Sequence, residues 1–483
     1  MKLIGIDLGT TNCKVGLFDR EGNDITVLTR PMITYTDKKL GMYYHAKELW
    51  ENIYDMLKEV KQLAGEEIGA IGITSMSETG LLVDKETHEE KTNLLPWFNQ
   101  NSKKAAAFVK TQDDPYHRFT KTGLRVNHKF GLSKILFLKE VDERLLDNAV
   151  WLSTSDYIAF KLTDVFATDY TLAARTYALD INTKKWDEDW IRKLGLSPEI
   201  FPQVLNSGER VGLVKAELGL GEGIAVAICG HDHLCASVGA GLLQVGSVFN
   251  SMGTAETVVG ITAELGLNEK KFDSLVTFGN HVLTDMCYWM KSIQTSGGCV
   301  EWMRNNLYEN HLSYGEIIEI LEKKADDPTG ILFFPYLSGG SGTKGELDSA
   351  TFMGLTKEHD KGDMIKSVFE GLSYQFDYVK EGLKDVLDVE LDEFTVVGGS
   401  TKNKAWMQLK ADITGAKLDL PEEPEATLLG AVIVAGIGLG IYQDVKEVEA
   451  IFARREKEVI VPKEGAGYEE MKAQYVRLHG VVY

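Results

Sequence analysis

Two glycine-threonine turns, far apart in the sequence, have the composition of phosphate-binding loops. The first lies in Ile4–Leu17, which reads IGIDLGTTNCKVGL, and the second in Val248–Gly260, which reads VFNSMGTAETVVG. Each segment predicts a strand, a polar Gly-Thr tip and a second strand. Glycine lets backbone N–H groups approach a phosphate closely, and the threonine hydroxyl adds a donor. One such hairpin is an ordinary feature, but two that face each other would clamp a polyphosphate between two similar domains.

An aspartate flanked by histidines follows a predicted strand. Asp232 follows the apolar run Ile224–Ile228 and precedes the small-residue run Ala236–Gly241, which predicts a strand and then a tightly packed helix. A carboxylate at the end of a buried strand lies where ligands bind in α/β sheets, and it can take a proton from a hydroxyl. The alternative is a simple helix cap. A metal shared by His231 and His233 is not expected, since the two side chains are expected to point to opposite faces.

Two charged residues flank the first turn. Asp7 ends the first strand, and its carboxylate has the hard oxygen chemistry that Mg²⁺ prefers, unless it merely braces the hairpin. Lys14 follows the turn, where its ammonium group would reach a phosphate, unless it is a solvated surface residue. The pair predicts a magnesium-bound polyphosphate at this hairpin.

The elements that must position these residues alternate between helices and strands, so the predicted class is α/β. Ala70–Thr74, Ile224–Ile228 and Phe394–Val397 predict buried strands, and an apolar stripe from Ile365 to Leu383 predicts a long helix. A chain of 483 residues exceeds one ordinary core. Together with the repeated hairpin, this predicts two domains, 1–243 and 244–483, with a cleft between them.

Composition excludes several classes of protein. The formal charge is −20 and no run of five or six Lys or Arg occurs, which argues against nucleic-acid and membrane partners. Five scattered cysteines without a CxxC pair indicate neither a disulfide framework nor a structural zinc site. The apolar segment Ala426–Tyr442 is shorter than the ~20 residues of a membrane span and is expected to be a buried helix. The N-terminal apolar run is too short for a signal peptide, so a cytoplasmic location is expected.

The first hairpin resembles that of the actin, Hsp70 and sugar-kinase superfamily. Further segments resemble the FGGY carbohydrate kinases, which include xylulokinase and glycerol kinase. They are Gly72–Thr79, Pro96–Phe98, Ser155–Thr163, Gly230–His233, Phe334–Gly339 and Val397–Gln408. The resemblance implies two ribonuclease H-like domains of the actin-like ATPase type, and an enzyme that uses ATP and Mg²⁺ to phosphorylate a sugar or polyol.

The resemblance also implies a role for individual residues. It places Mg²⁺ at Asp7 and makes Asp232 the general base. The implied nucleotide contacts are Thr10, Thr11, Lys14, Gly253, Thr254, Gly297, Gly398, Gly399 and Asn403. Most of them belong to the second domain.

On the acceptor side, the resemblance places Glu78, Trp97, Asp232 and His233 against the sugar. Glu78 matches an acid that binds polyol hydroxyls in glycerol kinase, and Trp97 matches a tryptophan at the edge of the pocket. A carboxylate accepts hydrogen bonds from vicinal hydroxyls, and an indole provides an apolar wall. The alternatives are a surface glutamate and a core tryptophan.

The chain departs from the family pattern at two places. Ser75–Glu78 reads SMSE where xylulokinases have QMHG, and glycerol kinases have an arginine at Ser77 and an aromatic residue near Lys129. Asn99 and Asn101 replace an acid and a base that the family tends to carry. If these amides brace a lid, they do so more weakly than an ion pair. If they touch substrate, the acceptor differs, so the identity of the sugar stays open.

The predicted reaction is transfer of the γ-phosphate of ATP to a small neutral ketose or polyol. A neutral acceptor is expected because the formal charges around the pocket are negative and the nearby basic side chains are expected to face solvent. The pocket residues are Glu78, Asp232, Trp97, Asn99 and Asn101, and the basic residues are Arg125 and Lys129. The alternatives are a nucleotide-switch protein and a sugar sensor with little turnover, the latter suggested only by Asn99 and Asn101. The resemblance also implies a homodimer.

Overall fold

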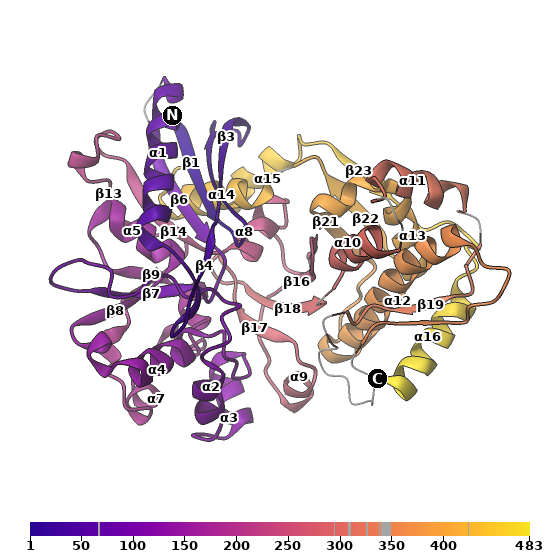
Figure 1. Ribbon diagram of the computed structural model, residues 1–483. Helices are drawn as coiled ribbons and strands as arrows, with labels where there is room; N and C mark the ends of the chain where they lie inside the picture. Colours follow the sequence, from indigo (N-terminus) through magenta and orange to yellow (C-terminus); the bar gives the residue numbers. More distant parts are fainter. Residues whose placement is uncertain are drawn as a thin grey trace.

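The computed structural model describes residues 1–65, 68–293, 295–307, 311–324, 327–337, 339, 349–423 and 425–483. Ser338, within the Phe334–Gly339 segment, lies outside them. Two mixed sheets, each covered by helices, lie side by side (Figure 1), and a pair of helices from distant parts of the chain lies between them.

The first sheet contains the first glycine-threonine hairpin at its centre. Its strand order is β13 (Arg210–Leu213), β14 (Ala225–His231), β6 (Ile68–Ser75), β1 (Lys2–Leu8), β2 (Asn12–Phe18) and β3 (Asp24–Pro31). The strands β14, β6 and β1 are parallel to one another. β13 is antiparallel to β14, β2 is antiparallel to β1, and β3 is antiparallel to β2. Parallel strands need both faces covered, which explains their nearly continuous apolar sequences.

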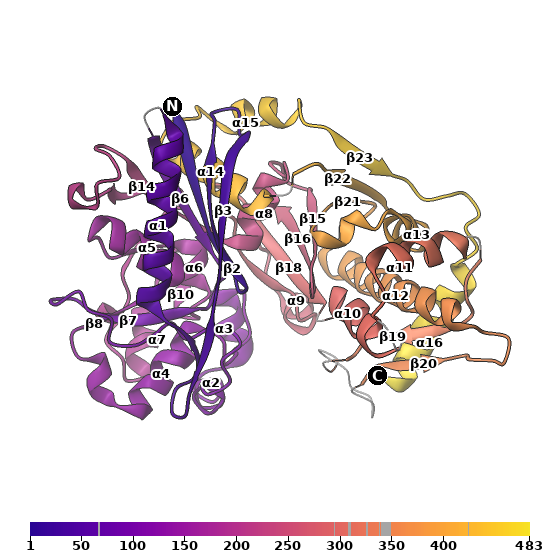
Figure 2. The same cartoon turned by 45° about the horizontal axis from the view of Figure 1, so that its top comes forward.

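The second sheet repeats this arrangement around the second hairpin (Figure 2). Its order is β23 (Lys457–Ile460), β22 (Lys417–Pro421), β21 (Glu393–Val397), β15 (Val248–Met252), β16 (Glu256–Thr262), β18 (Cys287–Ile293) and β17 (Thr277–Asn280). Again three neighbouring strands, β22, β21 and β15, are parallel and their neighbours are antiparallel. The predicted α/β class with two similar domains is therefore confirmed.

Helices and short strands complete the two halves. The helices of the first half are α1 (Ala46–Ala64), α2 (Lys103–Lys110), α3 (Pro115–Thr122), α4 (Gly131–Val141), α5 (Thr154–Thr163), α6 (Tyr170–Ala174), α7 (Glu188–Lys193) and α8 (Asp232–Gly239). Those of the second half are α9 (Glu269–Asp273), α10 (Gly297–Asn306), α11 (Tyr314–Lys323), α12 (Lys361–Leu387), α13 (Lys404–Thr414), α14 (Ala426–Gly438), α15 (Val445–Phe452) and α16 (Glu469–Val482). The short strands are β4 (Thr34–Asp37), β5 (Gly41–Tyr44), β7 (Gly80–Asp84), β8 (Ala149–Ser153), β9 (Ala167–Asp169), β10 (Leu179–Asp180), β11 (Lys185–Trp186), β12 (Gln203–Leu205), β19 (Leu332–Phe334) and β20 (Thr351–Met353).

The apolar segment that begins at Ala426 is buried, as expected. It forms α14, which packs against α8 and against β1, β6 and β14 of the first sheet. Among the described residues, no helix is long and apolar enough to cross a membrane. The strands of the first sheet all precede the predicted boundary at residues 243 and 244, and those of the second sheet all follow it. Helix α14 also follows the boundary but packs against the first sheet, so one apolar core includes residues of both halves.

The backbones of α8 and α14 touch at two glycines. A Cβ atom on Gly239 would lie 1.8 Å from the carbonyl oxygen of Ala426, and one on Gly430 would lie 1.8 Å from that of Cys235. Both neighbours are backbone atoms, so no side-chain rotation relieves the clash. The spacing of the two helices is thus set by the absence of side chains at this crossing.

We expect Gly430→Ala to destabilise the protein by roughly 3 kcal/mol or more, because the helices must separate to admit the methyl group. Thermal unfolding should show a midpoint lowered by about 3 °C or more. The matched control is Gly382→Ala in α12, where a Cβ meets nothing within 4 Å in the described part of the chain. That control should gain up to about 1 kcal/mol of helix propensity. Equal midpoints for the two variants would contradict the packing argument.

Candidate active site

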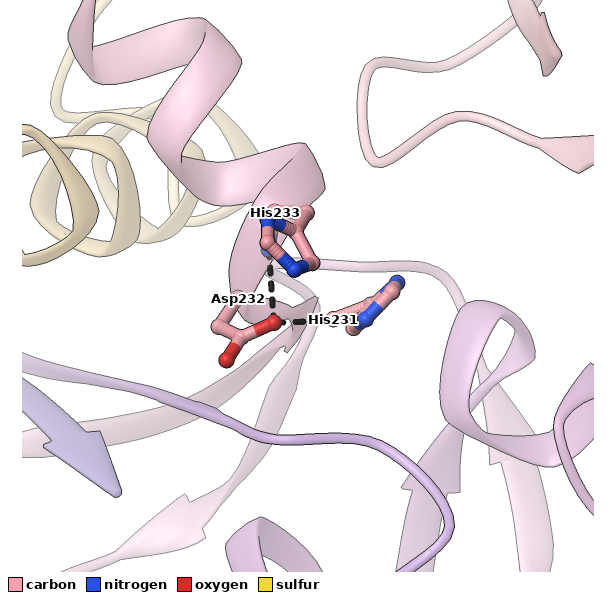
Figure 3. Close-up of side chains that lie close together, drawn as sticks. All are labelled: His231, Asp232 and His233. Carbon is pink, nitrogen blue, oxygen red and sulfur yellow. Dashed lines mark hydrogen bonds and ion pairs between the residues drawn. The ribbon is translucent and has the colours of Figure 1, made fainter. Parts of the chain in front are cut away.

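Asp232 lies at the junction where β14 ends and α8 begins. Its Oδ1 accepts a hydrogen bond from the backbone N–H of His233 at 2.7 Å and lies 3.2 Å from Nε2 of His231 (Figure 3). Its Oδ2 accepts no hydrogen bond from the residues that the structure describes, and the side chain is 24% exposed. Burial raises the pKa of Asp232 to about 7. The N-cap position of α8 is His231, so Asp232 is not the helix cap.

The two histidines lie closer together than the sequence predicts. Their ring centroids are 5.4 Å apart in an edge-to-face arrangement. The expectation that they point to opposite faces is therefore wrong, since side chains two residues apart in an extended segment share a face. Ligand atoms of His231, Asp232 and His233 all lie within 4.8 Å of one another, a spacing that could admit a metal ion. A cation there would have to displace the two nitrogen contacts that Oδ1 already makes.

Glu78 carries the densest set of polar contacts in the site. It follows β6 with a φ of 64°, in the left-handed region that glycine favours. Arg175 donates to Oε1 through Nε at 2.9 Å and through a second guanidinium nitrogen, Lys129 Nζ lies 3.2 Å from the same oxygen, and the Ser77 hydroxyl donates to Oε2 at 2.5 Å. Burial alone would raise the pKa of Glu78, but Arg175 and Lys129 hold it well below its usual range.

These contacts correct one premise of the sequence argument. Lys129 is half-buried and its ammonium group pairs with Glu78, and Arg125 donates to the backbone carbonyls of Val276 and Lys271 in the second half of the chain. Arg175, which the sequence did not single out, is 3% exposed and lies directly after the short helix α6. No local motif marks it, since its partner is 97 residues away.

Lys134 anchors the two loops that carry Glu78 and Trp97. This buried lysine of α4 donates to the backbone carbonyls of Glu78, Leu95 and Pro96 at 2.5, 2.9 and 2.9 Å. Burial lowers the pKa of Lys134 to about 7. Trp97 is 41% exposed, and its indole N–H donates to the Thr10 hydroxyl at 3.0 Å. Trp97 is thus no core residue, and it links the acceptor side to the first hairpin.

Asn99 and Asn101 both hold the turn between β4 and β5. The Asn99 amide donates to the carbonyls of Leu40 and Met42 at 2.7 and 2.8 Å, and Asn101 donates to the carbonyl of Lys39 at 3.2 Å. Asn99 is buried. The side-chain amides are thus used to brace this turn, and neither forms a hydrogen bond with Glu78, Trp97 or Asp232 in the described part of the chain.

The first hairpin brings two carboxylates close to one lysine. Asp7 pairs in register with Lys14 across β1 and β2, and Lys14 Nζ lies 2.7 Å from a carboxylate oxygen of Glu425, directly before α14. Lys14 is therefore not a solvated surface residue. Burial, followed by the negative charge of Asp232, raises the pKa of Asp7 to about 8. A buried carboxylate beside a second one fits a hard divalent cation, because the cation would relieve their repulsion.

The second hairpin opens onto a cavity of about 450 Å³, a size typical of small-molecule sites. Five of the residues predicted to bind nucleotide line it, namely Gly253, Thr254, Gly297, Gly399 and Asn403. Gly398 adjoins them at a φ of 112°, where a Cβ would lie 2.4 Å from the Met252 carbonyl oxygen. Thr10, Thr11 and Lys14 lie on the first hairpin and are not among the lining residues.

Local sequence explains the shape of this cavity. The N–H groups of Gly297 and Gly298, at the start of α10, donate to the carbonyls of Gly253 and Thr254 at 3.0 Å. The Asn403 side chain accepts from the N–H of Trp406 at 3.0 Å and caps α13. Tyr314 and Ile318 of α11 complete one wall, and the sequence did not point to them because wall positions need only be apolar or aromatic.

Comparison with known proteins agrees with this arrangement. Residues 2–239 match the model of the N-terminal domain of the FGGY family of carbohydrate kinases, and residues 248–439 match its C-terminal domain. A glycerol kinase of Clostridium beijerinckii is 28% identical over 92% of this chain and 91% of its own length. A xylulose kinase of Bacillus subtilis is 27% identical over 94% and 91%.

The fold has solved counterparts as well. The crystal structure of Plasmodium falciparum glycerol kinase with ADP superposes with a TM-score of 0.90 at 24% identity, over 100% of this chain and 98% of that one. The duplicated sheet, the paired hairpins and the matched sequence extend over nearly the whole chain. The chain belongs to the FGGY family of carbohydrate kinases, phosphotransferases that act on an alcohol group.

Proposed function

We propose that this kinase transfers the γ-phosphate of ATP to a hydroxyl of a small neutral ketose or polyol, with Asp232 as general base. In this proposal residues 1–243 carry most of the acceptor site and 244–483 carry most of the nucleotide site. The observation that carries it is the Asp232 carboxylate, whose Oδ2 accepts from none of the described residues and which lies beside the Glu78 cluster and close enough to Asp7 to raise the pKa of Asp7.

Charge balance supports a neutral acceptor, for a different reason than the sequence suggested. Two carboxylates, Glu78 and Asp232, are matched by two cations, Arg175 and Lys129, and both cations contact Glu78. An anionic acceptor would have to compete with Glu78 for those cations in a partly desolvated site. A hydroxyl instead donates to Oε2 of Glu78, where Ser77 occupies one lone pair. Two of the relatives are named glycerol kinase and xylulose kinase, after neutral acceptors, which also supports a neutral acceptor for this chain.

The chemical step follows from these positions. As the acceptor oxygen attacks the γ-phosphorus, its proton passes to Oδ2 of Asp232, whose pKa of about 7 suits transfer near neutral pH. Glu78, held by Arg175 and Lys129, orients the neighbouring hydroxyls, and Trp97 offers an apolar face to the C–H groups. Asp7 would hold Mg²⁺, which supplies positive charge against the phosphate oxygens.

The two hairpins divide the nucleotide between them in this proposal. The cavity behind Gly253 and Thr254 accommodates the nucleoside, and the backbone N–H groups at both hairpin tips face the phosphates. Lys14 supplies a cation at the first tip, in exchange for part of its contact with Glu425. ADP bound to the glycerol kinase of similar fold is consistent with this assignment.

The test of the proposed function is a panel of acceptors with saturating Mg²⁺ and ATP, with ADP release as the readout. We expect at least one ketose or polyol to be phosphorylated more efficiently than every aldonate and sugar phosphate. A sugar sensor would bind ligand without turnover. The bracing role of Asn99 and Asn101 removes the observation that suggested a sensor. An aldonate preferred at least tenfold over every neutral sugar would contradict the neutral acceptor.

We expect Asp232→Asn to lower kcat by a factor on the order of 10²–10⁴, because an amide cannot take the hydroxyl proton. Nucleotide affinity, measured by calorimetry, should stay within a few fold of wild type, since Asp232 is not among the residues that line the nucleotide cavity. Asp55→Asn on the exposed face of α1 is the matched control and should leave both quantities unchanged. A variant that retains more than about a tenth of kcat would refute the base assignment.

We expect Gly253→Val to raise the KM for ATP about tenfold or more, because its side chain blocks the approach of phosphate to the hairpin N–H groups. The unliganded fold accommodates it, since a Cβ there meets only the Ala255 carbonyl at 3.6 Å among the described residues. Gly9→Val should act in the same direction, although a Cβ there lies 3.1 Å from the Asn12 carbonyl. Gly480→Val, in open space on α16, is the control. Normal ATP affinity in both hairpin variants would mean that the repeat is architectural.

A further inference from the structure

His231 is a buried histidine whose two ring nitrogens have different surroundings. Nε2 lies 3.2 Å from Oδ1 of Asp232, whereas Nδ1 is buried and has no hydrogen-bond partner among the described residues. The residue itself is 4% exposed, and its backbone N–H donates to the Thr171 hydroxyl at 3.0 Å. The ring is therefore held in place by its surroundings and faces the carboxylate with one defined nitrogen.

We propose that His231 is a positioning residue that donates from Nε2 to Oδ1 of Asp232 and thereby leaves Oδ2 as the oxygen that takes the acceptor proton. The inference rests on the proposed function of Asp232 as the base. It assigns separate tasks to the two carboxylate oxygens, one for orientation and the other for chemistry.

The tautomer follows from the contacts of the ring. If the proton were on Nδ1, that buried N–H would lack an acceptor, and the lone pair of Nε2 would face a carboxylate oxygen. With the proton on Nε2, that donor nitrogen lies 3.2 Å from Oδ1 of Asp232, an acceptor within reach of a hydrogen bond. Burial lowers the pKa of His231 well below its usual value, so the ring carries a single proton. The neutral Nε2–H tautomer therefore fits both the surroundings of the two ring nitrogens and the lowered pKa of the ring.

Two donors on Oδ1 restrict rotation of the carboxylate. The second donor is the backbone N–H of His233, at 2.7 Å, which comes from the first turn of α8 and cannot move independently of it. Together the two donors hold Oδ1 away from the acceptor, and Oδ2 accepts from no described residue. Proton transfer needs the base within about 2.6–3.2 Å of the hydroxyl, so loss of this orientation should lower kcat.

A matched pair of amides separates the two ring nitrogens. The side-chain nitrogen of His231→Gln reaches about as far as Nε2, whereas that of His231→Asn reaches only as far as Nδ1. We expect His231→Asn to lower kcat by about tenfold or more, and His231→Gln to recover most of that loss. The KM for ATP should change little in either variant. Equal kcat values for the two amides would overturn the proposal, and His117→Gln on the exposed helix α3 controls for histidine loss.

Non-additivity gives a second kinetic test. In a protein that already carries Asp232→Asn, the further change His231→Asn should cost almost nothing, because His231 acts through the Asp232 carboxylate. A full additional loss would show that His231 acts in another way, and would overturn the proposal.

A spectroscopic measurement tests the inference without any acceptor. The ¹⁵N shifts of the His231 imidazole should show the Nε2–H tautomer in the wild-type protein, and the signal should move in Asp232→Asn. A Nδ1–H tautomer would overturn the positioning role, whatever the enzyme phosphorylates. Failure of every acceptor in the panel would instead contradict the proposed function, so the two failures are distinguishable.

Discussion

The close contact of two helix backbones at Gly239 and Gly430 is the constraint on which the rest of the site depends. One helix, α8, begins with the candidate base Asp232, and the other, α14, begins directly after Glu425, the partner of Lys14. Because carbonyl oxygens lie where side chains would otherwise project, the spacing between the helices has almost no tolerance. The base and the lysine of the first hairpin are thereby held in one packed unit, although Asp232 and Glu425 are almost 200 residues apart in the chain.

Buried charge defines the acceptor side. Glu78 tolerates a left-handed backbone conformation and burial because Arg175, Lys129 and Ser77 satisfy its carboxylate, while Lys134 holds its carbonyl. Removing one member of such a cluster leaves an uncompensated charge, which costs far more free energy than the intact cluster contributes. The arrangement therefore restricts the geometry of the acceptor site more than it stabilises the fold. The proposal of a neutral acceptor rests on this pairing, because both cations already contact Glu78.

The two sheets share the arrangement of their central strands, but their hairpins carry different residues. At the first hairpin the tip is followed by Lys14 and preceded by a carboxylate, Asp7, which suits cation and phosphate chemistry. At the second hairpin Glu256, at the start of β16, forms a buried ion pair with Lys410 of α13 and accepts a hydrogen bond from the Ser296 hydroxyl. These contacts connect the strand that follows the hairpin to α13 and to the residue before α10. The first hairpin thus contributes charged side chains, and the second contributes a shaped backbone.

Local sequence was enough to predict the strands, the two hairpins and the buried helix at Ala426, because periodicity and turn chemistry act over a few residues. The same local patterns, together with resemblance to the family, pointed to Asp232, Glu78 and most of the cavity residues.

Tertiary structure alone decided the partners of Glu78, the pairing of Lys14 with Glu425, the bracing role of Asn99 and the approach of His231 to His233. Arg175 and Glu78, or Lys14 and Glu425, are separated by about a hundred or several hundred residues, and no local pattern records which charge a buried side chain will meet. The wrong expectation for Lys129 arose in this way, because a lysine in a loop-like segment is usually solvated unless a distant carboxylate, brought close by the fold, offsets the cost of burying it.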